Sequence, residues 1–183
     1  PLTTAAIRDP LVQCQQSLNT VGLTTIADGK LLDLIRKLDT FGAHLVTLDV
    51  RQESTRHSDL MGEITLALGL GDYRDWSEAD RRAFLEKEIN DLRPLIPMHF
   101  QCSAPCQEVL DTFGVVAKAP REALGCYVIS MASEPSDILA VQLLLKATGG
   151  PIDLPVSPLF ETLDDLDGAP TTISALLTNA DYL

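Results

Sequence analysis

Two side chains in this sequence are suited to binding a charged substrate and a metal ion. Arg51 lies in the stretch Asp49-Val50-Arg51-Gln52-Glu53, and its planar guanidinium can donate two parallel hydrogen bonds to a carboxylate or a phosphate. Glu161 lies in Leu159-Phe160-Glu161-Thr162, and its carboxylate is a hard oxygen ligand of the kind that a hard divalent cation prefers. An arginine combined with a metal ion would suit a phosphorylated acid as the substrate.

Three short apolar runs predict the strands that would carry these side chains. They span His44 to Val50, Cys126 to Met131 and Leu154 to Leu159. Nearly continuous apolarity, without strict alternation, is typical of parallel strands that helices cover. Pro155 and Pro158 predict that the third strand has few ladder bonds or a ragged end.

Helical patterns separate the three runs. Apolar residues at helical spacing predict three apolar helix faces, which are Leu31-Leu34-Ile35-Leu38, Leu60-Ile64-Ala67-Leu68 and Ile138-Val141-Leu144-Leu145. Gly42, Gly69 and Gly149 follow these faces as stop signals. Ser77, with an acidic residue three positions later, predicts a helix start, and so does Pro135 among acidic residues. The segment from Leu92 to Cys106 contains three prolines and is predicted to be a connector.

Strands that alternate with helices predict an α/β fold with parallel crossover connections, as in a barrel or a doubly wound sheet. Three strands cannot close a barrel, so the chain would form either a small open sheet or an arc of something larger. In a barrel, the carboxyl ends of the strands and the loops after them form the active face. Polar residues lie at these predicted strand ends, namely Asp49, Arg51, Gln52, Glu53, Ser130, Ser133, Glu161, Asp164 and Asp165.

The same residues also have plain structural interpretations. Arg51 and Glu53 would suit a solvated loop with surface ion pairs. Glu161 would suit a helix start, where a carboxylate interacts favourably with the helix dipole. His57 lies in a charged helix start and is expected to be a surface or capping residue, whereas His44 is expected to be structural.

The composition excludes several classes of function. A net charge of −12 argues against nucleic-acid binding and against a surface that faces anionic lipid, although a few arginines can still attract a small anion into one cleft. No apolar run is long enough to span a membrane, and no signal peptide opens the sequence. The four cysteines lack the spacing of a disulfide framework, and Cys102 and Cys106 lack a second pair of metal ligands. Reduced thiols in a cytoplasm are therefore expected, and a first residue of Pro1 suggests a fragment or a processed chain.

Several longer segments resemble the phosphoenolpyruvate carboxylase family, in their order and approximate spacing. These segments are Asp49 to His57, Gly71 to Glu78, Tyr127 to Ala132, Pro135 to Val141 and Pro158 to Leu166. Together they extend from about Phe41 to the end of the chain, and the residues before Phe41 resemble the helices that precede this region in the family. An ordered set of long segments is far more specific than a single motif.

The resemblance implies a fold and an activity. It implies an arc of a parallel (β/α)8 TIM-type barrel with many additional helices and about three barrel strands in this chain. Residues 1–183 would be a single segment of the barrel domain, with preceding helices over 1–42 and barrel strands and crossover helices over 43–183. Family members are carbon–carbon lyases that form oxaloacetate and phosphate from phosphoenolpyruvate and bicarbonate, through carboxyphosphate and a metal-stabilised enolate. They are cytoplasmic homotetramers that require Mg²⁺ or Mn²⁺, replenish the citric acid cycle and can serve carbon fixation.

The resemblance also implies roles for single residues. It gives Arg51 the role of substrate binding and Glu161 the role of metal ligand. The family's catalytic histidine lies in an upstream segment of the Thr-Ala-His-Pro-Thr type, which this sequence lacks. A second metal carboxylate and a glycine-rich loop with arginines are expected beyond Leu183. The chain is therefore expected to be about the middle fifth of an enzyme and inactive alone. The alternatives are a non-catalytic scaffold or interaction module, and another barrel enzyme acting on a phosphorylated acid.

Overall fold

A computed structural model describes residues 3–179 and residue 182 of the chain. The start of the chain at Pro1 and its end at Leu183, both used in the sequence interpretation, lie outside the described residues. The contacts divide the chain into two units, Pro1–Thr47 and Leu48–Leu183.

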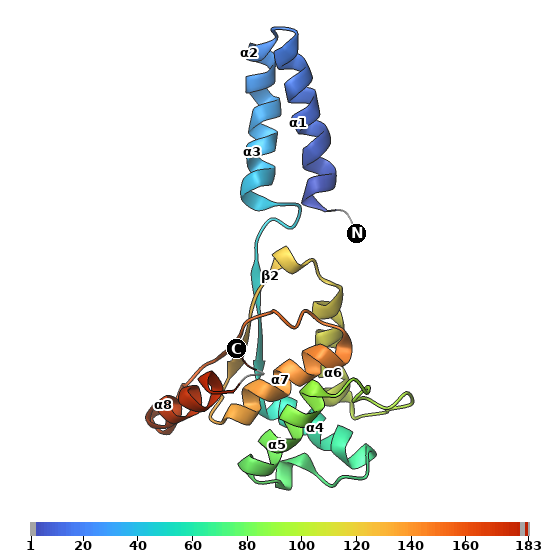
Figure 1. Ribbon diagram of the computed structural model, residues 1–183, viewed down its shortest axis with the longest axis vertical. Helices are drawn as coiled ribbons and strands as arrows, with labels where there is room; N and C mark the ends of the chain where they lie inside the picture. Colours follow the sequence, from blue (N-terminus) through green and yellow to red (C-terminus); the bar gives the residue numbers. More distant parts are fainter. Residues whose placement is uncertain (1–2, 180–181, 183) are drawn as a thin grey trace. The chain divides into compact units, whose positions relative to one another are not determined.

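The first unit is helical. Its elements are α1 (Thr4–Thr20), α2 (Thr24–Ile26), the π-helical segment η1 (Ala27–Leu31) and α3 (Leu32–Phe41). Helices α1 and α3 lie side by side (Figure 1), joined by an ion pair between Arg8 and Asp39. Gly42 ends α3 with a φ of 60°, which glycine adopts without steric cost. The stop signal predicted at Gly42 is therefore confirmed.

The second unit contains the sheet and the helices that cover it. Its elements are β1 (Leu48–Glu53), α4 (Ser54–Ala67), η2 (Tyr73–Asp75), α5 (Glu78–Asn90), α6 (Ala104–Lys118), η3 (Arg121–Ala123), β2 (Leu124–Ser130), α7 (Pro135–Thr148), β3 (Val156–Pro158) and α8 (Leu163–Leu177). Over the described residues, three parallel strands form one open sheet in the order β1-β2-β3. Helix α7 packs against α4, α5 and α6 beside this sheet (Figure 1). The predicted α/β class with three parallel strands is confirmed.

The predicted bounds of the first strand are wrong. Strand β1 begins at Leu48, opposite Leu124, and continues to Glu53, opposite Ser130. His44 lies in a turn after α3, so it does not enter a strand. Leu45 is 72% exposed and has a φ of 71°, which extended strands do not allow. The apolarity of this run therefore does not reflect burial in a sheet. As a result, Arg51 and Glu53 lie within the last residues of the strand and not after it.

The other two strands lie close to their predicted positions. Strand β2 spans Leu124–Ser130, two residues earlier at its start than predicted. Strand β3 is reduced to Val156–Pro158, as expected for a strand flanked by prolines. Its pairing with β2 is extended by hydrogen bonds from Tyr127 N to Pro155 O (2.8 Å) and from Leu159 N to Ile129 O (2.8 Å). The segment after β3 is thus tied to the end of β2.

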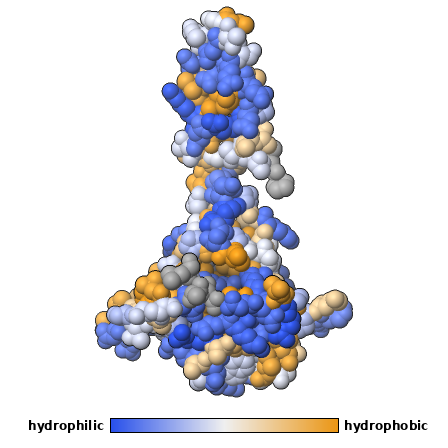
Figure 2. Space-filling model, viewed as in Figure 1, coloured by the Kyte–Doolittle hydropathy of each residue, from blue (hydrophilic) through white to orange (hydrophobic). Residues whose placement is uncertain are grey.

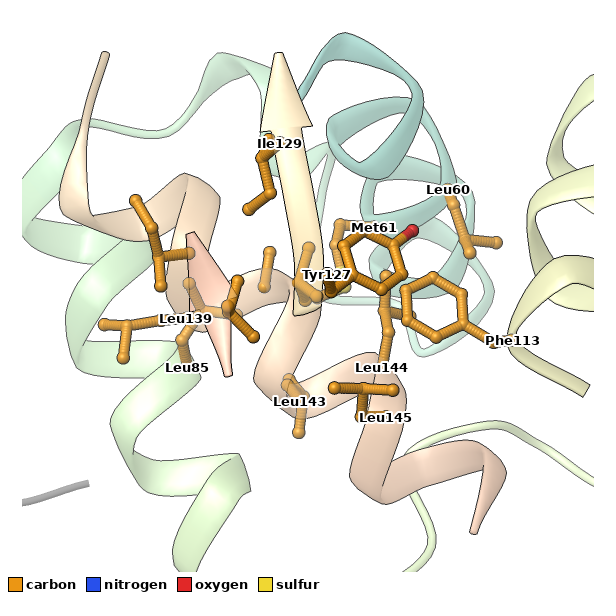
Figure 3. Close-up of a cluster of buried hydrophobic side chains, with 14 of the residues drawn as sticks. Leu60, Met61, Leu85, Phe113, Tyr127, Ile129, Leu139, Leu143, Leu144 and Leu145 are labelled. Atoms are coloured by element: carbon orange, nitrogen blue, oxygen red, sulfur yellow. The ribbon is translucent and has the colours of Figure 1, made fainter. Parts of the chain in front are cut away.

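The core of the second unit forms between the sheet and the helices. Tyr127 and Ile129 of β2 are buried against residues of α4, α6 and α7, as Figure 3 shows. The Tyr127 ring stacks on Phe113 at a centroid distance of 5.3 Å. All four residues of the predicted α7 face are buried, so that prediction is confirmed. The predicted α4 face is correct at Leu60 and Ile64, but its last turn at Ala67 and Leu68 is exposed.

Local capping explains where the helices begin. Ser77 Oγ accepts a hydrogen bond from Asp80 N (3.2 Å), which confirms the predicted start of α5. Pro135 is the first residue of α7, and Gly149 ends this helix with a φ of 75°. The predicted connector ends earlier than expected, because α6 begins at Ala104 and includes the buried Cys106. The four cysteines are free thiols in the structure. A search of the described residues finds no helix with the length and apolarity needed to cross a bilayer.

Lys146 ties α7 to the end of α5. Its ammonium group donates hydrogen bonds to the carbonyl oxygens of Glu88 (2.9 Å) and Ile89 (2.6 Å), and to that of Asp91. The last carbonyls of a helix have no partner within the helix, so a cation at this position both satisfies them and interacts favourably with the helix dipole.

We therefore expect Lys146→Met, which keeps most of the side-chain length, to lower the free energy of unfolding by about 1–3 kcal/mol. The measurement is urea denaturation monitored by circular dichroism. Lys118→Met is the matched control, because Lys118 also lies in the last turn of a helix but is exposed. Equal stability of the two variants would contradict the role given to Lys146.

Candidate functional site

A pocket of about 560 Å³ lies at the carboxyl ends of the three strands. Its lining comes from β1, β2, the segment after β3, and the helices α4 and α6. The lining residues are Arg51, Gln52, Glu53, Arg56, Glu108, Thr112, Val128, Ser130, Leu159 and Glu161. Arg51 pairs with Val128, and Glu53 with Ser130, so these four residues share one face of the sheet. The pocket is therefore built by parallel strands that end at the same edge.

Arg51 is exposed in the pocket. Neither Arg51 nor Glu53 forms an ion pair with another described residue, and Glu53 instead accepts a hydrogen bond from Thr55 Oγ1 (2.9 Å). The surface ion pair considered for these two residues therefore has no counterpart in the described part of the chain. The guanidinium fork of Arg51 is available to an anion in the pocket.

Glu161 lies between β3 and α8, on the same pocket. Its Oε2 atom accepts a hydrogen bond from the backbone N–H of Met131 at 3.1 Å. The capping of α8 is performed by other residues, since Thr162 Oγ1 accepts from Asp165 N and Asp165 accepts from Thr162 N. The backbone N–H of Thr162, which donates to the Asp165 carboxylate, holds the pKa of Asp165 below its usual value. The carboxylate of Glu161 therefore makes no capping hydrogen bond to α8.

Only some of the predicted strand-end residues meet at this pocket. Arg51, Gln52, Glu53, Ser130 and Glu161 line it. The other predicted residues, Asp49, Ser133, Asp164 and Asp165, are not among its lining residues. Asp49 accepts a hydrogen bond from Cys126 N (3.1 Å) and so serves the pairing of β1 with β2.

The carboxylates of the pocket have the right chemistry for a hard divalent cation but form only part of a site. Glu53 and Glu161 offer oxygen ligands, which Mg²⁺ and Mn²⁺ prefer. Among residues 3–179 and 182, no three His, Cys, Asp or Glu side chains are grouped closely enough to hold a metal ion. A metal bound at Glu161 would need further ligands from outside this chain or from water.

Arg56 is a second arginine of the pocket that the sequence interpretation did not single out. It lies in the first turn of α4, and its Nη2 atom is 2.7 Å from Glu108 Oε2 on α6. The ion pair holds the guanidinium over the pocket that Arg51 lines. The sequence could have indicated Arg56 by its place in the first helical turn after a strand, because the loops and helix starts that follow parallel strands form the active face of a barrel.

The expectation that His57 is a surface or capping residue is wrong. His57 is fully buried, with Nε2 2.9 Å from the Tyr127 hydroxyl and its ring beside those of Phe113 and Tyr127, at centroid distances of 6.0 Å and 5.6 Å. Burial, assisted by the positive charge of Arg56, lowers the pKa of His57 to about 3. The sequence carries a signal for this, because His57, Leu60, Met61 and Ile64 recur at helical spacing on one apolar face.

Comparison with known proteins identifies relatives over almost the whole chain. The family described as phosphoenolpyruvate carboxylase matches residues 2–183. The chain is 55% identical to the phosphoenolpyruvate carboxylase of Pectobacterium atrosepticum over 177 residues, which cover 97% of this chain and 20% of that protein. It is 56% identical to the same enzyme of Yersinia enterocolitica and 55% identical to that of Serratia proteamaculans, over 95% of this chain and 20% of each relative. The chain thus spans about a fifth of the length of the curated relatives it matches.

The buried His57 generates a prediction about stability and pH. In the unfolded chain His57 binds a proton below its ordinary pKa of 6.5, whereas in the folded chain it stays neutral down to about pH 3. Because the unfolded state binds more protons between these values, stability falls as the pH is lowered through this window. Between pH 7 and pH 5 we expect His57 to account for a loss of about 2 kcal/mol.

The measurement is urea denaturation of the wild type and of His57→Phe at pH 7 and pH 5. The loss on acidification should be smaller in His57→Phe by about 2 kcal/mol. His99→Phe is the control, because His99 is exposed and should leave the pH dependence as it is in the wild type. An identical pH dependence of His57→Phe and the wild type would contradict the neutral, buried state of His57.

Proposed function

The chain belongs to the phosphoenolpyruvate carboxylase family, and on this premise we propose that it is one segment of a complete enzyme that forms oxaloacetate and phosphate from phosphoenolpyruvate and bicarbonate. In this proposal Arg51 binds the anionic substrate and Glu161 is a ligand of Mg²⁺ or Mn²⁺. The observation that carries the proposal is that Arg51 and Glu161, 110 positions apart in the sequence, line one pocket at the strand ends.

Arg51 has the chemistry that the substrate requires. Phosphoenolpyruvate carries a phosphate and a carboxylate, and a guanidinium fork binds either group through two charge-assisted hydrogen bonds. Arg56 lies on the same pocket, but its charge is paired with that of Glu108, which leaves Arg51 as the arginine of the pocket without an ion pair to a described residue. In this proposal Arg51 holds the substrate in place while carboxyphosphate and the enolate of pyruvate form.

Glu161 has the chemistry that the metal requires. A divalent cation, when bound, supplies positive charge that stabilises the negative charge developing on the enolate oxygen. Glu161 contributes one carboxylate to hold the cation, and its position is fixed by the hydrogen bond from Met131 N. We propose that the remaining ligands come from parts of the complete enzyme outside this chain.

We further propose that β1, β2 and β3 form an arc of a parallel (β/α)8 barrel. The proposal is supported by their parallel pairing in sequential order. It is also supported by apolar surface that further protein would cover. Figure 2 displays apolar patches among hydrophilic residues, and Leu92 and Met98 are 98% and 92% exposed.

Family membership supports the remaining parts of the proposal. We propose that the complete enzyme is a cytoplasmic homotetramer that replenishes the citric acid cycle and can serve carbon fixation. We also propose that this chain alone does not turn over, because it lacks a Thr-Ala-His-Pro-Thr segment. Its His57 is neutral and buried against Phe113 and Tyr127, so it does not replace the missing histidine.

We expect Arg51→Ala in the complete enzyme to raise the KM for phosphoenolpyruvate roughly 10- to 100-fold, because charge-assisted hydrogen bonds to the substrate are lost. Steady-state kinetics with a coupled assay of oxaloacetate formation measures this change. Arg36→Ala is the matched control, since Arg36 is exposed on α3 and lies outside the pocket. Unchanged kinetics of Arg51→Ala would exclude the proposed role.

We expect Glu161→Gln to weaken activation by Mg²⁺ or Mn²⁺ at least about tenfold, because an amide oxygen is a poorer ligand than a carboxylate. The measurement is the metal concentration that gives half-maximal activity of the complete enzyme. Asp164→Asn removes a nearby exposed charge that is not on the pocket, and should leave this concentration unchanged. An unaltered metal titration of Glu161→Gln would remove Glu161 from the ligand set.

A further inference from the structure

Met131, directly after β2, has an unusual backbone conformation. Its φ is 54°, in the left-handed region that side chains other than glycine disfavour. Such conformations persist where surrounding contacts hold them, and they cluster at functional sites. The Met131 side chain is 46% exposed, so packing of this side chain is not what holds the conformation.

Two hydrogen bonds hold the Met131 backbone from two different strand ends. Its N–H donates to Glu161 Oε2 at 3.1 Å, beyond β3. Its carbonyl oxygen accepts from Ser54 Oγ at 2.7 Å, at the start of α4 directly after β1. The peptide groups on both sides of Met131 are therefore fixed, one by Glu161 and the other by Ser54.

The hydroxyl of Ser54 donates to the Met131 carbonyl and does not cap α4, the helix that Ser54 begins. Ser54 is 6% exposed, and the start of α4 has no side-chain capping hydrogen bond. Serine at a helix start commonly bonds to nearby backbone groups. Here it donates to a carbonyl that is 77 residues away in the sequence.

We propose that Ser54 and the left-handed backbone of Met131 form a positioning relay for Glu161. This proposal rests on the proposed function of Glu161 as a metal ligand. Ser54 fixes the Met131 carbonyl, the Met131 N–H then holds Oε2 of Glu161, and Oε1 accepts no hydrogen bond from any described residue. Ser54 follows Arg51 by three positions, so the relay links the end of the strand that carries the substrate arginine to the metal carboxylate.

The relay is tested by direct binding of Mn²⁺ to the complete enzyme without substrate, measured by electron paramagnetic resonance of the free ion. We expect Ser54→Ala to raise the Kd for Mn²⁺ roughly threefold to tenfold, because one orienting hydrogen bond is lost. Ser54→Thr keeps a hydroxyl and should bind Mn²⁺ within about twofold of the wild type.

Thr172→Val is the matched control for Ser54→Ala. Thr172 Oγ1 donates to the carbonyl of Ser133 at 2.8 Å, so the substitution removes the same kind of bond two residues beyond Met131. This bond does not lead to Glu161, and Mn²⁺ affinity should therefore stay at the wild-type value. A Kd raised equally by Thr172→Val and Ser54→Ala would mean general loosening and would overturn the relay.

Substitutions at Met131 test the backbone conformation without relying on Ser54. Met131→Gly adopts a positive φ without strain and should keep the Mn²⁺ affinity. Met131→Val, whose branched side chain strongly disfavours a positive φ, should weaken binding roughly as Ser54→Ala does. Equal affinities of the Gly and Val variants would overturn the relay.

Glu161→Gln separates failure of the relay from failure of the proposed function. If Glu161→Gln weakens Mn²⁺ binding and Ser54→Ala does not, the relay is wrong and Glu161 remains a ligand. If Glu161→Gln binds Mn²⁺ as tightly as the wild type, the proposed function of Glu161 fails and the relay fails with it.

Discussion

The position of every candidate site residue depends on the pairing of β2, the central strand, with a neighbour on each side. Its register with β1 sets Arg51 opposite Val128 and Glu53 opposite Ser130. A shift of one residue would turn Arg51 to the face that carries Ile129, which is buried against the helices. The same strand holds the segment after β3, because Leu159 N donates to Ile129 O. One strand therefore determines where both the arginine and the carboxylate lie.

The core fixes this strand more specifically than apolar packing alone would. Tyr127 is fully buried, and its hydroxyl meets His57 of α4 while its ring stacks on Phe113 of α6. A buried polar pair must keep its hydrogen bond, since an unpaired hydroxyl or imidazole in the core costs about 1–3 kcal/mol. The pair thus selects the alignment of α4 against β2 that also brings Ser54 to Met131. Helix α4 and strand β2 therefore both position the pocket residues and pack the core.

The sequence predicted the elements better than it predicted the site. Apolar periodicity and capping signals were sufficient for the start of α5, for α7 and for the presence of three parallel strands, because these signals are local. The run from His44 was misassigned because its apolar residues are exposed, and exposure depends on contacts that a local pattern does not contain. The left-handed conformation of Met131 was beyond prediction for the same reason, since its two hydrogen bonds join residues 77 and 30 positions away. The roles of Arg51 and Glu161 remain predictions, although both side chains line one pocket.

The charges of the pocket connect the two proposed roles. Its lining contains two arginines, Arg51 and Arg56, and three glutamates, Glu53, Glu108 and Glu161, which leaves a formal charge of −1. Part of the positive charge is already used, because Arg56 is paired with Glu108. A substrate that carries a phosphate and a carboxylate would meet an unfavourable field in such a pocket. A divalent cation at Glu161 would change the formal charge to +1, so in the proposed enzyme the metal ion would favour binding of the anion as well as stabilise the enolate. In the proposed enzyme, the hydrogen bonds from Met131 N to Glu161 and from Ser54 to the Met131 carbonyl would therefore affect the binding of both ligands without contacting either.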